Sequence, residues 1–555
     1  MTQRTPRKKF FITTAIDYAN SKPHLGTAYE KIGADVIARY HRLRGEDVFF
    51  LMGNDEHSLN VEKKARDLGK DPKAYCDEMA GIFQDTWRRL DVSYDRFIRT
   101  TDEDHKAAVR KFLQTIHDSD RQDIYRGHYE GWYCVSCEAF YQEKDLVGGN
   151  CPTHGTKPEW IREENWFFRL SAYQKRLEAH ILEHPEFIEP ESRRNEILNV
   201  VRGGLQDVSI SRGGTKWGIP LSFDEGSVAY VWVDALINYV TGAGYGTDDA
   251  RFARIWPADV HVIGKDITRF HGVIWPALLW AAGLEPPRKV HAHGFVNLAG
   301  AKMSKTLGTV LDPIEVAERI GVDALRYFLM REIPFDRDGD FTWERLQDVC
   351  NADLANGIGN LLARTTAMIE RYLDGKLERA SQFMDDYRDK GKRSGDGFPT
   401  GIGNFNDLQI HLNKYDAEMN KLDPRSALLV PSAMIRNLDE YISQEKPFAI
   451  AKQMVEDPRF RLNLERILCF CAESIGVIAI LLCPFMPHTA QRIWEDIGAE
   501  GSVADIRIKD QSQQGSSMEG DGRAWGTILR DGARVRKGPA LFPRLELIPP
   551  ADAKP

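Results

Sequence analysis

The sequence lacks the features that mark membrane and exported proteins. Its 555 residues hold no uninterrupted apolar run that approaches the ~20 residues of a membrane-spanning helix. The basic start, MTQRTPRKK, leads directly into a strand-like segment and is too short for a secretory or transit peptide. These absences argue against a membrane protein and predict a cytoplasmic one.

Basic residues are fewer than acidic ones, and cysteine is rare. The formal net charge is −8, so a polyanion such as RNA would have to bind a local basic surface against the overall field. Only eight cysteines occur, and three of them lie close together in the sequence. We expect the scattered ones to be buried thiols in a reducing compartment, namely Cys76, Cys350, Cys469, Cys471 and Cys483.

Short apolar runs predict an α/β fold with a parallel sheet. KFFITTAI and DVFFLMG are the nearly continuous runs expected of strands covered on both faces, and strand-like SVAYVWVDA, VHVIGKD and KVHAHGFVNL follow later. Polar residues follow each run, and ligands of such sheets bind beyond the carboxyl ends of the strands. Between the two sets, residues 116–224 have the character of an insertion, and residues 351–500 have the apolar spacing of a helix bundle.

Two loop sequences suggest nucleotide chemistry. In PHLGT, His24 can donate to phosphate oxygens and Gly26 allows close approach at a turn from strand to helix; an incidental loop histidine is the alternative. In GAKMSKTLG, Lys302 and Lys305 flank Ser304 and suit the shifting charge of a triphosphate, although a solvated basic loop is common. Because both motifs seldom occur together in one chain, the pair favours nucleotide binding more strongly than either motif alone.

PHLG and KMSKT resemble the two signatures of class I aminoacyl-tRNA synthetases, and the order of further blocks resembles the methionyl-tRNA synthetase family. These blocks are TTAIDYANSKPHLG, GNDEH, GWYCVSCEAFY, EENWFFRLS, ISR with KWGIP, YVWVDALINY, GKDITRFHGVIWPA and HAHGFV. The resemblance implies a Rossmann-like catalytic domain with a zinc-binding insertion, followed by an α-helical anticodon-binding bundle. It also implies a methionine–tRNA ligase that uses ATP with Mg²⁺, L-methionine and tRNA(Met).

The resemblance assigns the active site. Asp55 would anchor the substrate ammonium, Arg212 would contact carboxylate or phosphates, and Asp266 would hold the ribose side or the pocket. For Asp55, a helix N-cap is the alternative. The methionine side chain would be lined by Ile16, Tyr18, Trp232, Ala235, Leu236, Tyr239, His271 and Trp275; ATP would contact His24, Gly26, Gly294, Val296, Lys302, Ser304 and Lys305.

Two of these positions depart from the family pattern. Leu236 stands where many relatives have proline. Thr27 replaces the usual second histidine of the first signature, and we expect its hydroxyl to donate a hydrogen bond in that place, with a rate penalty. The catalytic set is therefore expected to be His24, Gly26, Thr27, Lys302 and Lys305.

Four residues in the insertion have the spacing of a metal site. Cys134 and Cys137 form one CxxC pair, and after thirteen intervening residues Cys151 and His154 form a CxxH pair. Cys₃His suits one tetrahedral, structural zinc ion, with a disulfide as the alternative.

The helical region would recognise tRNA. The resemblance places Asn360 and Arg364 at the anticodon, four residues apart on one helix face, and Phe448 where relatives stack a tryptophan on a base. Helix packing is the alternative for Phe448.

The domain organisation expected along the chain has six parts, and the protein is expected to be a monomer. The alternatives for its function are a class I synthetase for another apolar amino acid and an inactive tRNA-binding relative. The parts are a first catalytic half (1–115), the insertion (116–224), a second catalytic half (225–310), a linking segment (311–350), the anticodon-binding domain (351–500) and a tail (501–555).

Overall fold

The computed structural model contains two compact units, which we describe separately. The sheet unit comprises Lys9–Ala34 and Val48–Gly294, and the helical unit comprises Met1–Lys8, Asp35–Asp47 and Phe295–Pro555. The structure describes residues 7–134, 139–141, 143–152, 155–213, 215–298, 300–302, 310–383, 405–454, 456–508, 518–519 and 528–546. Within these ranges, none of the helices combines the length and the apolar character that crossing a bilayer requires.

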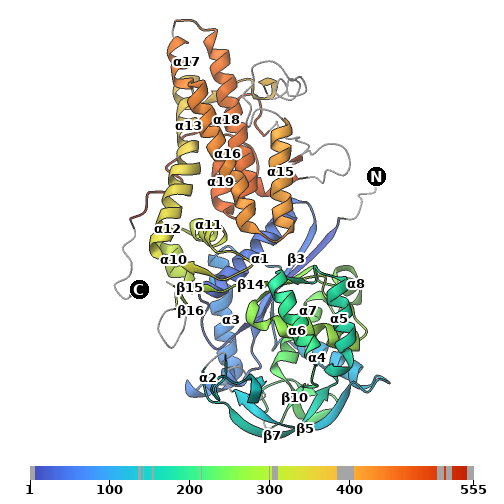
Figure 1. Cartoon of the computed structure of the whole chain (residues 1–555). Coiled ribbons are helices and arrows are strands. Elements are labelled where there is room, and N and C mark those ends of the chain that lie inside the picture. The colour runs from blue at the N-terminus through green and yellow to red at the C-terminus, as the bar shows by residue number, and fades with distance from the viewer. Residues whose placement is uncertain are drawn as a thin grey trace. The chain divides into compact units, whose positions relative to one another are not determined.

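The sheet unit is built on a parallel sheet with the strand order β2-β3-β1-β13-β14-β8, in which β4 also pairs with β3. Figure 1 labels β3 and β14 of this sheet. The register pairs Thr14 with Val262 and Asn54 with Arg99, both in parallel. The strands are β1 (Lys9–Thr14), β2 (Asp17–Tyr18), β3 (Asp47–Asp55), β4 (Arg96–Arg99), β8 (Ile188–Glu189), β13 (Val260–Gly264) and β14 (Val290–His293).

Burial explains why these strands have continuous apolar sequences. Every residue of β13 is buried, as is every residue of β1 after Lys9, because helices cover both faces of the sheet. The helices of this unit are α2 (Leu59–Asp67), α3 (Pro72–Arg89), α4 (Glu103–His117), α5 (Gln174–Glu183), α6 (Glu191–Arg202), α7 (Val231–Ala243), α8 (Asp249–Ile255), α9 (Trp275–Ala281) and the first half of α1 (Leu25–Leu43).

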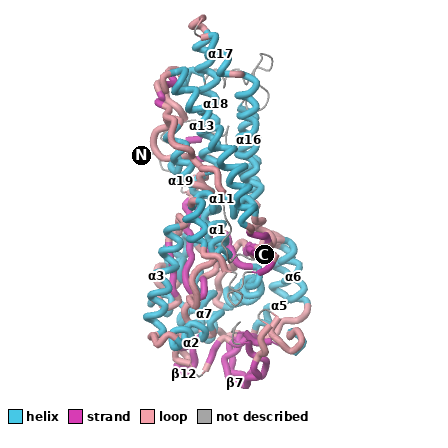
Figure 2. Tube along the Cα trace, turned by 90° about the vertical axis from the view of Figure 1, so that its left-hand side faces the viewer, coloured by secondary structure: helices cyan, strands magenta, loops and turns pink. Residues whose placement is uncertain are grey.

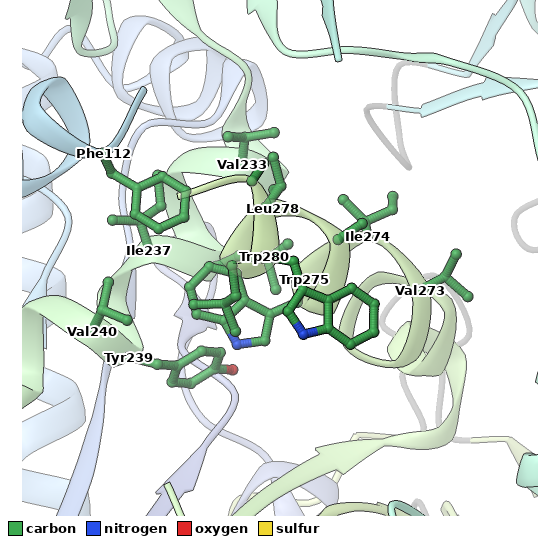
Figure 3. Close-up of a cluster of buried hydrophobic side chains, with 14 of the residues drawn as sticks. Phe112, Val233, Ile237, Tyr239, Val240, Val273, Ile274, Trp275, Leu278 and Trp280 are labelled. Atoms are coloured by element: carbon green, nitrogen blue, oxygen red, sulfur yellow. The ribbon is translucent and has the colours of Figure 1, made fainter. Parts of the chain in front are cut away.

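The apolar core of the sheet unit joins α4, α7, α9 and the π-helix η4 (Phe270–Ile274). Phe112 of α4 stacks on Trp275 of α9 with 6.0 Å between ring centroids. Figure 3 shows Phe112 with side chains of α7, such as Ile237, and of α9, such as Leu278. This core fixes the position of α7 and α9, the two helices that carry most of the expected methionine pocket.

The insertion forms an antiparallel sheet of its own with the order β6-β5-β7-β9. Its long hairpin pairs Ile124 with Phe168 and Tyr133 with Glu159. Its strands are β5 (Ile124–Cys134), β6 (Ala139–Tyr141), β7 (Glu159–Phe168) and β9 (Val208–Ser209); a second small sheet contains β10 (Ser211–Arg212), β12 (Asp224–Ala229) and β11 (Pro220–Leu221). Short 3-10 helices cover Glu143–Asp145, Leu170–Tyr173 and Lys265–Ile267.

The helical unit contains long helices that run side by side, among them α13, α16 and α18 (Figures 1 and 2). A buried ion pair ties its pieces together: Arg326 donates to Asp35 at 2.7 Å, and to the carbonyl oxygens of Pro484 and Phe485. The helices are α10 (Pro313–Ile320), α11 (Val322–Glu332), α12 (Trp343–Val349), α13 (Asn360–Leu373), α15 (Phe405–Asn420), α16 (Pro424–Glu445), α17 (Pro447–Gln453), α18 (Phe460–Leu482) and α19 (Pro487–Asp496), with a π-helix at Cys350–Gly359 and a 3-10 helix at Val503–Asp505.

Short strands complete this unit. A three-stranded sheet has the order β16-β15-β17, in which Val296 pairs in parallel with Gly339. The strands are β15 (Val296–Leu298), β16 (Ala301–Lys302), β17 (Gly339–Phe341), β18 (Lys376–Leu377), β19 (Arg507–Ile508), β20 (Met518–Glu519) and β21 (Ala533–Arg534).

The α/β prediction with a helical C-terminal region is confirmed, but one expected strand was wrong. In SVAYVWVDA the strand ends at Ala229, and Val231 begins helix α7. Twelve of the thirteen residues of α7 are buried, so the helix has no solvent-exposed polar face. Its apolar, partly β-branched sequence therefore has the same pattern as a buried strand. The scattered cysteines are buried as expected.

Candidate functional site

The candidate site lies at the switch point of the parallel sheet. The chain passes from β1 to β3 on one side, and later supplies β13 and β14 on the other side of β1. A crevice forms at such a reversal, beyond the carboxyl ends of the strands. Ile16 and Tyr18 follow β1, Asp55 ends β3, and Asp266 follows β13, so the sheet brings four expected site residues to one edge.

An aromatic wall continues from the end of β1 onto α7. The Tyr18 and Trp232 rings meet edge to face, with 5.9 Å between centroids. Trp232 in turn stacks on Phe270, 3.9 Å away and nearly parallel. Ala235 and Leu236 of the same helix are buried beside this wall. Such a surface is apolar and polarisable, which suits a thioether.

The deeper part of the wall is made of uncharged polar rings. The Tyr239 hydroxyl lies 2.8 Å from His271 Nε2, and His271 Nδ1 lies 3.1 Å from the Ile267 carbonyl oxygen. A carbonyl only accepts, so the proton of His271 is on Nδ1, and Nε2 accepts from Tyr239. Burial lowers the pKa of His271 to about 4, so the ring is neutral at physiological pH.

Trp275 and His261 support this part of the wall. His261 stacks on Tyr239 at 4.1 Å, and its Nε2 accepts from the Trp275 indole at 3.3 Å. Its Nδ1 lies 2.7 Å from Thr13 Oγ1. Burial, and next the nearby His271, hold the pKa of His261 well below its usual range. Figure 3 shows Tyr239 and Trp275 within the buried cluster.

Asp55 is the buried carboxylate at the end of β3. It is 3% exposed and pairs in register with Tyr18. The helix that follows, α2, is capped by Ser58, which accepts from Val61 N. The alternative role of Asp55 as a helix cap is therefore wrong, since Ser58 caps α2; Asp55 instead pairs in register with Tyr18, the first ring of the aromatic wall.

Arg212 and Asp266 occupy different surroundings. The Arg212 guanidinium is buried, lies 4.1 Å from the Tyr230 ring centroid and donates to Ser209 Oγ at 3.0 Å. Asp266 is exposed on the 3-10 helix after β13. Gly294 is buried directly after β14.

The PHLGT turn is a reciprocal helix cap. His24 Nδ1 accepts from Gly26 N at 3.1 Å and from Thr27 N at 3.2 Å, so the imidazole proton resides on Nε2. Thr27 Oγ1 accepts from His24 N at 2.8 Å and donates to the His24 carbonyl oxygen at 2.7 Å. The pattern is that of a capping box, with His24 as N-cap and Thr27 at the third helical position.

The cap shows how this turn is held without a ligand. The backbone N–H groups of Gly26 and Thr27 donate to His24 Nδ1. The Thr27 hydroxyl donates to the His24 carbonyl oxygen, so it fixes the backbone of His24; its expected role toward the nucleotide stays a prediction.

The second signature belongs to the helical unit. Val296 lies in β15, and the backbone of Lys302 lies in β16, where it pairs with Asn297. Ser304 and Lys305 lie outside the described residues, as do Cys137 and His154 of the expected zinc site.

The other two expected zinc ligands lie close together. Cys134 and Cys151 are both buried. Cys134 Sγ is 3.7 Å from Thr156 Oγ1, and Cys151 N donates to Thr156 O at 2.9 Å. Gly155 N closes the turn onto the Cys151 carbonyl oxygen. Within the described ranges, no three metal-binding side chains form a cluster.

The expected anticodon residues lie on α13 and α17 of the helical unit. Asn360 is exposed at the start of α13. Arg364, one turn later, pairs with Asp439 at 3.0 Å and remains 41% exposed. Phe448, the second residue of α17, is 49% exposed, so it is not a buried packing residue.

Comparisons with known proteins assign the family. The model of the class I tRNA synthetases (M) matches residues 10–157 and 144–366. The methionine–tRNA ligase of Caldanaerobacter subterraneus is 43% identical over 542 residues, covering 98% of this chain and 80% of that protein. That of Streptomyces coelicolor is 39% identical over 569 residues, covering 99% of each. The chain belongs to the methionyl-tRNA synthetase family.

Solved structures of this family agree with the fold. The methionyl-tRNA synthetase of Mycobacterium tuberculosis in complex with methionyl-adenylate has a TM-score of 0.84 and 38% identity, over 97% of this chain and 100% of that one. Its apo form has a TM-score of 0.79 and 35% identity, over 98% and 99%. The family prediction is confirmed.

Two residues beside the expected pocket were missed by sequence reasoning. Phe270 stacks on Trp232, and His261 supports both Tyr239 and Trp275. Phe270 lies next to His271 in a block that resembles other methionyl-tRNA synthetases, so its position was a usable signal. His261 lies inside an apolar strand, where nothing in the sequence sets it apart.

The reciprocal cap predicts that the Thr27 hydroxyl matters more than the Thr27 methyl group. Thr27→Val removes the hydroxyl that serves His24, and loss of a capping side chain costs ~0.5–2 kcal/mol. We expect a lower melting temperature and a slower methionine-dependent ATP–pyrophosphate exchange. Thr27→Ser keeps the hydroxyl and should retain both. Equal rates for the serine and valine variants would contradict this role.

Proposed function

We propose that the protein activates L-methionine with ATP to methionyl-adenylate and transfers the methionyl group to tRNA(Met). The observation that carries this proposal is the neutral aromatic wall beside Asp55 at the sheet switch point. The wall suits the thioether, and a buried carboxylate suits the α-ammonium group. Membership of the methionyl-tRNA synthetase family supports both steps.

The reaction needs no side-chain nucleophile. A methionine carboxylate oxygen attacks the α-phosphorus in line, the bond to the bridging oxygen breaks, and pyrophosphate leaves. A ribose hydroxyl of the tRNA terminus then attacks the carbonyl carbon, and AMP leaves. The protein contributes position and charge stabilisation. His24 Nε2–H is oriented to donate to phosphate oxygens because Nδ1 is held by Gly26 and Thr27.

Lys302 and Lys305 are proposed to neutralise the charge that moves to pyrophosphate. ATP would enter with Mg²⁺, which supplies further neutralisation of its phosphates. Backbone atoms near Gly294 and Val296 would line the nucleotide, with Ser304 in the loop between the two lysines.

Methionine-dependent ATP–pyrophosphate exchange tests the function. We expect exchange with L-methionine, and a loss of orders of magnitude in Lys305→Ala with little change in melting temperature. Lys63→Ala, which removes an exposed lysine of α2, is the matched control. Exchange with another amino acid but not with methionine would contradict the specificity. Exchange with none would favour an inactive tRNA-binding protein.

We also propose that Cys134, Cys137, Cys151 and His154 hold one structural zinc ion. The described half of this site suits the ion chemically: both cysteines are buried, and Cys134 Sγ and Cys151 N each contact Thr156. A bound zinc ion would tie the β5–β6 end of the insertion to the turn at Cys151.

Metal analysis tests the zinc proposal. Cys134→Ser should lower the zinc content per chain and the thermal stability of the protein. Cys76→Ser, at a buried cysteine of α3, should leave the zinc content unchanged. Unchanged zinc in Cys134→Ser, or equal loss in both variants, would contradict the site.

The third proposal places the tRNA anticodon on α13 and α17. Asn360 and Arg364 are available on one face of α13, and the half-exposed Phe448 ring offers a stacking platform worth ~1–3 kcal/mol per base. The partly exposed pairing of Arg364 with Asp439 leaves part of the guanidinium accessible. The proposal includes a cytoplasmic monomer that acts on free tRNA(Met).

Separating the two reaction steps tests the anticodon proposal. Arg364→Ala should slow charging of tRNA(Met) while sparing pyrophosphate exchange, since exchange needs no tRNA. Arg371→Ala changes an exposed arginine of the same helix and is the matched control. Equal loss of both steps in Arg364→Ala would indicate a structural role.

A further inference from the structure

A buried carboxylate on α7 binds two histidines that the proposed reaction does not use. Asp234 is fully buried; its Oδ2 lies 2.8 Å from His57 Nδ1, and its Oδ1 lies 2.6 Å from His105 Nε2. Because a carboxylate only accepts, both imidazoles donate to it. We name Asp234, His57 and His105 the Asp234 cluster.

The cluster is strongly held. His105 Nδ1 lies 3.1 Å from Thr241 Oγ1, and Thr241 Oγ1 lies 3.0 Å from the Ile237 carbonyl oxygen, so a second polar contact holds the ring of His105 on α7. Burial by itself raises the pKa of Asp234, but His57 and His105 outweigh it, and the pKa lies below its ordinary value. Asp234 is therefore a buried anion that needs its two donors.

The cluster joins the two halves of the expected methionine site. His57 is two residues beyond Asp55, on the turn that follows β3. Asp234 lies in the first turn of α7, between Trp232 and Ala235 of the aromatic wall. The pair of His57 and Asp234 thus connects the segment that presents the ammonium anchor with the helix that presents the side-chain wall.

Other contacts fix the same turn from its far side. Glu56 N donates to Thr100 Oγ1 at 3.0 Å, and the Glu56 carboxylate binds Arg99 at 2.7 Å. The Trp217 indole donates to the Glu56 carbonyl oxygen at 2.7 Å, and its ring packs edge to face on His57. These contacts hold the turn after β3 against its other neighbours. The hydrogen bond between His57 and Asp234 then sets the distance of this turn from α7.

We propose that Asp234 is a positioning residue that sets Asp55 at the correct distance from the pocket wall through His57. This inference rests on the function proposed above. It makes recognition of the α-ammonium group depend on Asp234, although Asp234 itself does not touch the substrate. A purely structural Asp234 would instead affect every ligand of the pocket alike.

Two ligands that differ only in the amino group separate these roles. L-Methionine uses Asp55, whereas 4-(methylthio)butanoate has the same thioether chain and carboxylate without the ammonium. Dissociation constants for both, from titration of the intact protein, give a preference ratio. Wild type should prefer methionine.

Asp234→Asn keeps the shape but turns one acceptor into a donor that faces an imidazole N–H. Loss of a hydrogen bond to a charged group predicts a fall in the preference ratio by about tenfold or more. His57→Leu should lower the ratio similarly. His57→Asn, whose amide nitrogen can occupy the Nδ1 position, should retain most of it. Melting temperatures verify that each variant is folded.

The outcomes are distinct. If wild type binds neither ligand, or binds both equally, the proposed function and this inference both fail. If wild type prefers methionine and the ratio is unchanged in Asp234→Asn and His57→Leu, this inference alone is overturned. The same holds if His57→Asn loses as much preference as His57→Leu.

Discussion

The site depends on one constraint: parallel strands end at the same edge of a sheet. Because β1 lies between β3 and β13, the residues that follow these three strands must meet, whatever their distance in sequence. Asp55, Tyr18 and the segment after β13 are brought together in this way. The aromatic wall on α7 then needs only correct helix packing against the sheet, which the core around Phe112 and Trp275 supplies.

Three buried polar side chains around this site, those of His271, His261 and Asp234, have defined hydrogen-bond partners. His271 and His261 are neutral rings. His271 donates to the Ile267 carbonyl oxygen and accepts from the Tyr239 hydroxyl. His261 accepts from the Trp275 indole and lies within hydrogen-bond distance of the Thr13 hydroxyl. Asp234 is an anion directed by two imidazoles. Neutral groups thus lie where the apolar thioether is proposed to bind, and the charged Asp234 carboxylate lies where two histidines donate to it. This division fits the proposed ligand, which has one apolar and one charged end.

Sequence reasoning predicted the parallel sheet, the helical C-terminal region and the family, because strand-end motifs in the right order carry that information. It misassigned the start of α7, since a helix buried on all sides shows no period. It did not predict the capping contact of Thr27, because the sequence shows which residue type is present but not which backbone atom uses its proton. Asp234 and His261 could not be found, since their partners are distant in sequence and only the folded chain brings them together.

The pairing of Asp35 with Arg326 has a consequence for synthesis on the ribosome. The two residues are 291 positions apart, and both belong to the helical unit. The first strands and α1 are translated early, but the charge buried at Asp35 meets its partner only after the whole sheet unit has been made. The helical unit is assembled from three separate stretches of chain, so neither unit corresponds to one contiguous fragment. Truncation between Gly294 and Arg326 would therefore leave every residue of the sheet unit but remove the partner of Asp35, so the sheet unit can be translated in full before this buried charge is paired.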